Sequence, residues 1–215
     1  MQQSEALAIL NAGANVFLTG APGAGKTYVL NEFVRAAREE GANVAVTAST
    51  GIAATHINGQ TIHSWSGIGL ATSLSERLLK TIRTRRKRKL QAADILVIDE
   101  VSMMHAWLFD MVDQVCCRIR LDPRPFGGLQ VVVCGDFFQL PPVSTSNRNH
   151  DVIAPTPEFV SSRERYASLG RDPEGFITES LVWDELDCTV CYLTEQHRQD
   201  DGLSLIHISE PTRPY

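Results

Sequence analysis

The sequence lacks any apolar run that approaches ~18 residues, the length that spans a bilayer, so we expect no membrane span. The N-terminus also lacks the basic start and long apolar stretch of a secretory signal, so we expect a cytoplasmic protein. Cysteine is scarce, and the five cysteines are odd in number and lie in apolar segments, which excludes a disulfide scaffold. With 43% hydrophobic and 21% charged residues, the composition is typical of a globular domain.

The sequence also lacks excess positive charge, because 20 Lys and Arg face 25 Asp and Glu, for a net charge of −5. This balance excludes a protein that coats nucleic acid by bulk charge, so any contact with nucleic acid must be local. One local concentration exists, since the segment 83–89 carries six cations in seven residues. The run is explained either as the solvated face of a helix or as a patch that contacts phosphates.

Short, nearly all-apolar segments alternate with helical patterns along the chain. Apolar residues at helical spacing over 29–37 and 108–119 predict amphipathic helices. Strands that are apolar on both faces indicate a parallel sheet covered by helices on both faces, which is an α/β fold. The segment 144–175 is rich in Ser, Pro, Asn and charge with little periodicity, and we interpret it as a surface excursion. Strands are expected at 15–19, 43–47, 94–98, 129–134 and 189–193.

A phosphate-binding loop is predicted between the first strand and the first of these helices. Gly20–Thr27 reads GAPGAGKT and matches G-x-x-x-x-G-K-[ST] in the strand-to-helix context that the motif requires. The glycines allow backbone N–H groups to wrap phosphates at a helix N-terminus. Lys26 would add charge at the β- and γ-phosphates of ATP, and the Thr27 hydroxyl would ligate Mg²⁺. The other nucleotide-binding candidates are Gly20, Pro22, Gly23, Ala24 and Gly25.

Two carboxylates follow the third predicted strand, so Asp99 and Glu100 should emerge at the edge of the sheet where α/β folds bind ligands. Asp99 is the candidate Mg²⁺ ligand, and Glu100 is the candidate base that takes a proton from the attacking water. The alternative is that the two carboxylates have no catalytic role and only cap the helix that follows. These features predict a P-loop nucleoside triphosphatase, but the fold alone does not choose among kinases, GTPases, loaders and motors.

Five sequence blocks, in a fixed order, narrow the choice among these nucleoside triphosphatases. Together they resemble the motifs of the petite-integration-frequency helicase family, superfamily 1 DNA helicases related to RecD, over about residues 3–199. The resemblance implies a RecA-like ATPase domain that uses ATP and Mg²⁺ and acts on DNA. The blocks are TASTGIAA at 47–54, GQTIHSWSGIG at 59–69, DEVSM at 99–103, GDFFQLPPV at 135–143 and LTEQHRQ at 193–199.

The resemblance also implies roles at three further polar residues. Gln3 matches the glutamine that pairs with adenine, although Gln2 is adjacent and a solvated N-terminal glutamine is the alternative. Gln139 matches the residue that senses the γ-phosphate and couples it to DNA, with a structural turn residue as the alternative. Arg198 matches an arginine finger within the chain that stabilises transition-state charge, with a surface arginine as the alternative.

Single-stranded DNA is held by hydroxyl and backbone contacts to phosphates and by aromatic faces against bases. Aromatic residues near a sheet edge are often core residues instead, and a lone histidine is often only a hydrogen-bonded structural residue. Phe138 is a further possible stacking platform. The DNA-binding candidates from the resemblance are Thr50, Gly51, His63, Ser64, Trp65 and Phe137.

The last residues are interpreted as foreign to the protein. Leu203–Arg213 reads LSLIHISEPTR, which resembles the translation of a transposase-type sequencing adaptor, so we expect 203–215 to be a read-through tail. We then expect 1–202 to be the first RecA-like ATPase domain of a longer protein that continues into a second such domain. Cys188 and Cys191 have a metal-like spacing, but no second pair completes a zinc site.

The expected function is that of an ATP-dependent 5′-to-3′ DNA helicase in repair, recombination or telomere maintenance. We expect a monomer whose partners are single-stranded DNA and duplex junctions. If the protein is cellular, we expect it to be associated with the nucleoid. Loss of an arginine finger costs roughly 10³–10⁵ in rate, so without its second domain the chain should hydrolyse ATP slowly and not unwind DNA. Two alternatives stay open at this point: a P-loop ATPase that remodels or loads protein, and a nucleotide-binding remnant without catalysis.

Overall fold

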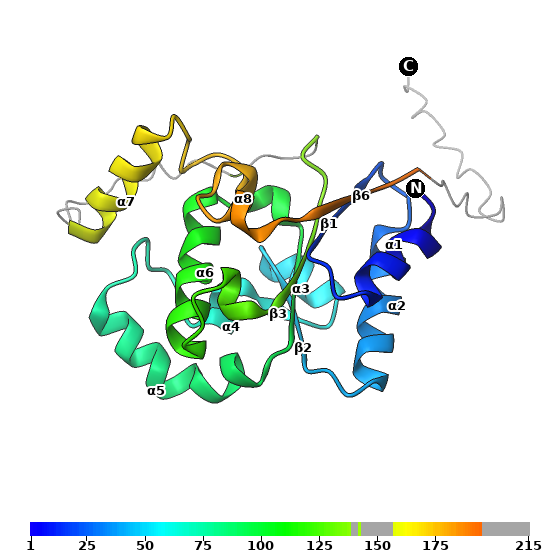
Figure 1. Ribbon diagram of the computed structural model, residues 1–215, viewed down its shortest axis with the longest axis horizontal. Helices are drawn as coiled ribbons and strands as arrows, with labels where there is room; N and C mark the ends of the chain where they lie inside the picture. The colour runs from blue at the N-terminus through cyan, green and yellow to red at the C-terminus, as the bar shows by residue number, and fades with distance from the viewer. Residues whose placement is uncertain (139–141, 143–156, 195–215) are drawn as a thin grey trace, which may run out of the picture.

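The computed structural model describes residues 1–138, 142 and 157–194, and within them six parallel strands form one sheet in the order β3-β2-β4-β5-β1-β6 (Figure 1). Each predicted strand is present within one residue of its expected bounds, and β3 is an additional short strand. The strands are β1 Val16–Gly20, β2 Val44–Ala48, β3 Gln60–Thr61, β4 Ile95–Asp99, β5 Gln130–Cys134 and β6 Thr189–Leu193.

Helices cover both faces of this sheet, as the sequence predicts (Figure 1). Successive strand residues point to opposite faces. Val16 and Leu18 therefore pack with α1 and α2, whereas Phe17 packs on the α6 side. The sheet is a RecA-like P-loop fold. The α-helices are α1 Gln3–Asn11, α2 Lys26–Glu39, α3 Gly51–His56, α4 Ile62–Ser66, α5 Glu76–Ala92, α6 Ala106–Arg120, α7 Pro157–Ser168 and α8 Trp183–Leu186.

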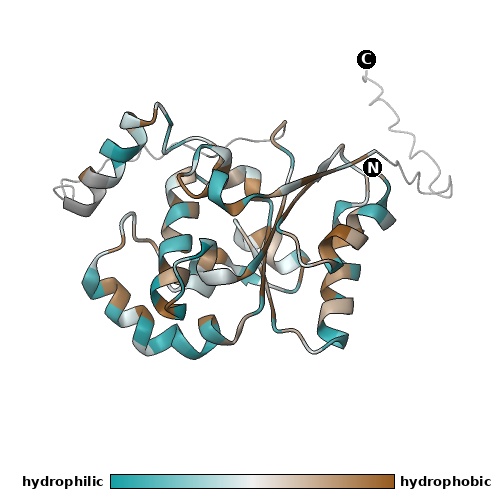
Figure 2. Ribbon diagram, in the orientation of Figure 1, coloured by the Kyte–Doolittle hydropathy of each residue, from teal (hydrophilic) through white to brown (hydrophobic). Residues whose placement is uncertain are grey.

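Apolar residues line the strands and the inner faces of the helices, while the outer helix faces are hydrophilic (Figure 2). No helix in the part of the chain that the structure describes is long and apolar enough to span a membrane. Short 3₁₀ helices complete the connections, at η1 Val101–Met103, η2 Pro125–Gly128 and η4 Ile177–Glu179.

Helix α7 lies inside the segment expected to be a surface excursion, and the sequence pattern does not predict it. Tyr166 of α7 is only 1% exposed and donates its hydroxyl hydrogen to Asp110 of α6. The same carboxylate accepts the backbone N–H groups of Leu181, at 2.9 Å, and Val182, at 3.0 Å. One buried carboxylate therefore connects α6 to α7 and to the segment before α8. Residues 144–156 of the excursion lie outside the described residues.

Asp110→Ala should destabilise the protein because it leaves three donors without their acceptor, two of them buried and the Leu181 N–H partly buried. We expect a loss of about 2–4 kcal/mol in the free energy of unfolding, measured by urea denaturation. Tyr166→Phe removes one donor and keeps the ring, and should cost only about 1 kcal/mol. Equal losses in the two variants would mean that the Leu181 and Val182 contacts contribute nothing.

Candidate functional site

The GAPGAGKT segment forms a loop between the end of β1 and the start of α2. Gly23 and Gly25 have φ of 80° and 83°, in the left-handed region that favours glycine. Gly25 is the residue before the first turn of α2, so the loop leads directly into a helix N-terminus. Backbone N–H groups and the helix dipole together make such a site favourable for phosphates. Pro22 and Gly23 are exposed at the tip, whereas Ala24 is buried beneath it.

Gly20 fixes where the loop begins. A Cβ atom at this position would lie 2.6 Å from the carbonyl oxygen of Leu193, so only glycine allows β1 and β6 to pair closely at this point. The pairing runs in register from Val16 with Thr189 to Gly20 with Leu193. The loop therefore leaves the sheet at the level where β6 ends.

The loop lysine is held by backbone oxygens of the loop itself. Lys26 Nζ donates to the carbonyl oxygens of Gly20 at 2.6 Å and Ala21 at 3.2 Å. These contacts place the ammonium group inside the curve of the loop, where a phosphate would meet it. Thr27 is exposed in the first turn of α2, so its hydroxyl is accessible to a ligand.

Gln3 lies against the phosphate loop, although Gln3 and its partner Ala24 are 21 positions apart in the sequence. Its side chain is only 8% exposed, and its Nε2 donates to the carbonyl oxygen of Ala24 at 3.2 Å. A Cβ atom at Gly25 would lie 2.1 Å from the same nitrogen. Gln2, in contrast, precedes α1 and forms a capping box with Glu5. The structure thus brings Gln3 rather than Gln2 to the loop, and adenine recognition by Gln3 stays a prediction.

Asp99 and Glu100 lie at the end of β4, at the same edge of the sheet as the loop. Glu100 has φ of 51° and ψ of 41°, a left-handed conformation that is rare for a side chain of this kind. Its N–H donates to Asp99 Oδ1 at 2.9 Å, and its carbonyl oxygen accepts the Ser49 hydroxyl at 2.6 Å. Strain of this kind persists only where neighbours hold it, and it is concentrated at functional sites.

Burial raises the pKa of the Glu100 carboxyl, and the neighbouring Asp99 and Asp136 carboxylates raise it further, whereas Lys26 lowers it. Asp136 lies two residues beyond β5 and is 7% exposed. The buried Cys134 thiol also lies beside Asp99, and its pKa is raised well above the usual value by burial first and then by this carboxylate. The loop lysine and three acidic side chains therefore share one electrostatic environment.

The donor set fits a magnesium ion shared with a phosphate ligand. Among the described residues, no group of three or more His, Cys, Asp or Glu side chains could hold a metal alone. Thr27 and Asp99 instead offer one hydroxyl and one carboxylate at the same sheet edge. Mg²⁺ commonly uses one or two protein oxygens and completes its shell with phosphates and water.

Thr50 and Gly51 begin α3, directly after β2. Thr50 Oγ1 caps this helix by accepting the Ala53 N–H at 3.2 Å, and Gly51 is exposed. A pocket of ≈ 420 Å³ joins this helix start to Glu100. A ligand on α3 would therefore contact the same pocket as the candidate base. The pocket is lined by Thr50, Ile52, Ala53, His56, Glu100, Ser102 and Met103.

His63 and Ser64 lie on the short helix α4. Ser64 is exposed, and its N–H donates to the Thr61 hydroxyl at 3.2 Å. His63 is half-buried, and burial lowers the pKa of its imidazole. Both side chains are accessible enough for the contacts that the resemblance implies, and those contacts stay predictions.

The burial of Trp65 and Phe137 favours the alternative that these two DNA-binding candidates are core residues. Trp65 is 0% exposed, because α4 turns its indole ring into the core on the α6 side of the sheet. Phe137 is partly buried and packs between Phe17 and Phe176, with ring centroids at 4.9 Å and 4.8 Å. Phe138, the next residue, is 95% exposed, so its ring is accessible to a base.

Two predicted catalytic residues, Gln139 and Arg198, lie outside the described residues, as does the 203–215 tail. Sequence reasoning missed Ser49 and Asp136. Asp136 had a detectable signal, since it is an acidic residue just beyond a predicted strand, as Asp99 is. Ser49 acts through its contact with a backbone carbonyl, which no sequence pattern reveals.

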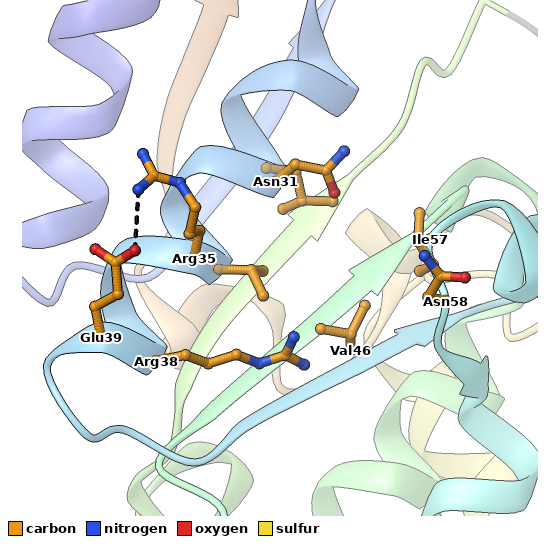
Figure 3. A pocket seen from close by; sticks show the side chains of 9 residues that line it. Asn31, Arg35, Arg38, Glu39, Val46, Ile57 and Asn58 are labelled. Carbon is orange, nitrogen blue, oxygen red and sulfur yellow. Dashed lines mark hydrogen bonds and ion pairs between the residues drawn. The ribbon is translucent and has the colours of Figure 1, made fainter.

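A second pocket of ≈ 420 Å³ lies beside the C-terminal half of α2, away from the phosphate loop (Figure 3). Two arginines line it: Arg35, which is paired with Glu39 at 3.0 Å and Glu32 at 2.6 Å, and Arg38. No glycine is among the described residues that line it, so this pocket lacks the glycine-rich helix N-terminus that favours phosphates at the first site.

Comparison with known proteins identifies the family. A model described as PIF1-like helicase matches residues 2–161. The chain belongs to the PIF1-like helicase family. Its relatives include an ATP-dependent DNA helicase Pif1 of Psychrobacter sp., which is 47% identical over 94% of this chain and 28% of that protein. The ATP-dependent DNA helicase RRM3 of Saccharomyces cerevisiae is 42% identical over 90% of this chain and 24% of that protein.

Solved PIF1 family structures share the fold. The Pif1 helicase of Candida albicans aligns with a TM-score of 0.73 at 33% identity, over 90% of this chain and 39% of that one. The Bacteroides Pif1 in complex with ADP-AlF3 and ssDNA aligns with a TM-score of 0.67 at 28% identity, over 93% of this chain and 43% of that one. The chain thus spans well under half of the relatives that it matches.

Gly25→Ala should displace Gln3 and strain the loop, because the new methyl group would overlap the Gln3 amide and a left-handed backbone disfavours alanine. We expect a loss of about 1–2 kcal/mol in the free energy of unfolding from the backbone term, measured by urea denaturation. Gln3→Ala combined with Gly25→Ala removes the overlap and keeps the backbone strain. If the double variant is no more stable than Gly25→Ala alone, the overlap is not a source of the loss.

Proposed function

We propose that this chain is the ATP-hydrolysing RecA-like domain of a 5′-to-3′ DNA helicase. The observation that carries the proposal is the convergence of the phosphate loop, the Asp99–Glu100 pair and the Thr50 pocket at one sheet edge. Membership of the PIF1-like helicase family supports it, as does the complex of Bacteroides Pif1 with ADP-AlF3 and ssDNA. The direction of travel rests on the family resemblance.

The residues present fit a bound Mg-ATP. Gly23 and Gly25 adopt conformations that leave the backbone open to phosphates, and Lys26 is already held within the loop. Thr27 and Asp99 would hold the magnesium ion, while Gln3 would face the adenine. When bound, Mg-ATP supplies the phosphoryl group that is transferred to water and the charge that stabilises its oxygens.

Glu100 would accept the proton of the attacking water. A carboxylate whose pKa is raised by burial and by neighbouring carboxylates is a stronger base than one in water. Its backbone is fixed on one side by Asp99 and on the other by the Ser49 hydroxyl, so its position does not depend on the side chain alone. Ser49 is thus a positioning residue for the base.

The same pocket would couple DNA binding to ATP hydrolysis. Thr50 would contact a DNA phosphate on one side of the pocket, and Glu100 lies on the other. A shift of α3 on binding DNA would therefore alter the surroundings of the base. We further propose that Gln139 and Arg198 contact the γ-phosphate and that a second RecA-like domain of the parent protein completes the site. The chain alone should then hydrolyse ATP slowly and not unwind DNA.

The ATPase rate of the chain, with and without single-stranded DNA, tests this proposal. Lys26→Ala should abolish nucleotide binding, because the loop loses its positive charge. Glu100→Gln should retain nucleotide binding and lower the rate by roughly 10²–10⁴. Glu40→Gln, an exposed residue after α2, is the matched control and should leave the rate unchanged. An unchanged rate in Glu100→Gln would refute the assignment of the base, and stimulation by protein partners but not by DNA would favour a protein-remodelling ATPase.

The two adjacent phenylalanines should respond differently to truncation. Phe138→Ala should weaken binding of a fluorescein-labelled single strand about 5- to 100-fold, because one stacked base contributes ~1–3 kcal/mol. Phe137→Ala should instead lower the free energy of unfolding by about 1–3 kcal/mol, since its ring packs against Phe17 and Phe176. Fluorescence anisotropy and urea denaturation on both variants check this, and unchanged DNA affinity in Phe138→Ala would exclude it as a platform.

A further inference from the structure

Helix α5 carries a net positive charge, whereas the rest of the chain carries a net negative charge. Its 17 residues hold eight of the 20 Lys and Arg residues and a single carboxylate, Glu76. The chain as a whole is negative, with a net charge of −5. An anionic partner would therefore be repelled by most of the protein and attracted to this helix. The cations of α5 are Arg77, Lys80, Arg83, Arg85, Arg86, Lys87, Arg88 and Lys89.

One stripe of α5 is apolar and the remainder faces solvent. Leu79, Ile82 and Leu90 are buried in the core on the α6 side of the sheet. The outer side of the helix is hydrophilic along its length (Figure 2). At 1.5 Å per residue the helix is about 25 Å long, and its cations are distributed over the sides and the outer face of this rigid, convex element. Of these cations, Arg86 is half-buried and the others are exposed.

Among the residues that the structure describes, carboxylates do not neutralise these cations. Within the described chain, none of the cations from Arg83 to Arg88 forms an ion pair, whereas Arg35, Arg118 and Arg124 each pair with a carboxylate. Burial lowers the pKa of Lys89, and repulsion from Arg86 lowers it further. Mutual repulsion in an exposed helix is a cost that an anionic ligand would relieve.

Helix α5 is held beside α4, the helix that carries His63 and Ser64. Lys89 Nζ donates to Gln60 Oε1 at 2.8 Å, immediately before α4. After α4, the Arg86 side chain lies against Gly67, where a Cβ atom would be 3.0 Å from Arg86 Cγ. Nucleic acid held by α4 would therefore be led toward the basic face of α5.

We propose that the exposed face of α5 binds the phosphate backbone of duplex DNA, independently of sequence. Sites for single strands combine positive charge with aromatic platforms, but α5 contains no aromatic residue and is convex. A duplex presents a rigid array of phosphates, which cations fixed on the exposed sides of a rigid helix can contact without any reading of sequence. This inference rests on the proposed function, since α5 would hold the duplex while the α3 and α4 surface holds the single strand.

The test compares a 20-base-pair duplex with a 20-nucleotide single strand, using the full chain and fluorescence anisotropy over a range of salt concentrations. The variant Arg85→Gln, Lys87→Gln, Arg88→Gln removes three exposed cations and retains residues that favour helix. The control variant combines Arg38→Gln, Arg124→Gln and Arg163→Gln, and it removes the same charge from other surfaces. Thermal unfolding of both variants verifies that they fold.

We expect the α5 variant to bind the duplex roughly tenfold more weakly, with the slope of log affinity against log salt reduced by roughly one per cation removed. Single-strand affinity should change about twofold or less, and the control should change neither. Duplex affinity equal to that of the native chain, or an equal loss on both probes, would overturn the proposal. If the chain does not bind the single strand but its duplex affinity still depends on α5, the proposed single-strand contacts are refuted. The proposal for α5 is then supported.

Discussion

The parallel pairing of β1 between β5 and β6 is the constraint on which the site depends. Gly20 permits β1 to approach Leu193 closely enough for this pairing, and the loop that follows then starts at the carboxyl edge of the sheet. Because β2 and β4 run in the same direction, Thr50 and Asp99 emerge at that edge as well. The chemistry of the site is thus assembled by strand direction rather than by proximity in sequence.

A small number of charged groups sets the protonation of Glu100 at this edge of the sheet. Lys26 supplies positive charge near Glu100, while Asp99, Asp136 and burial all favour the protonated form of that carboxyl. Binding of a magnesium ion and phosphates would change each of these interactions. The left-handed backbone of Glu100 is held by the Ser49 hydroxyl, and Ser49 connects the end of β2 to the end of β4. Glu100, the candidate base, and the start of α3 are therefore linked by backbone contacts as well as by a pocket.

Much of the fold could be predicted from local pattern. The strand segments are nearly all apolar, as buried parallel strands must be, and GAPGAGKT occurs where a strand meets a helix. Helix α7 escaped prediction because its apolar periodicity is weak and a polar contact between distant residues, that of Tyr166 with Asp110, joins it to α6. The two-residue strand β3 escaped because it exists only through pairing with β2.

The sequence by itself determined the loop, the acidic pair, the parallel α/β fold and the family, because these follow from backbone conformation, side-chain period and motif spacing. Only the tertiary structure decided which side chains reach a ligand. It placed Gln3 rather than Gln2 on the loop, buried Trp65, and exposed Phe138 instead of Phe137. The physical reason is that exposure depends on which elements pack over a side chain, and a residue's neighbours in sequence do not specify those elements.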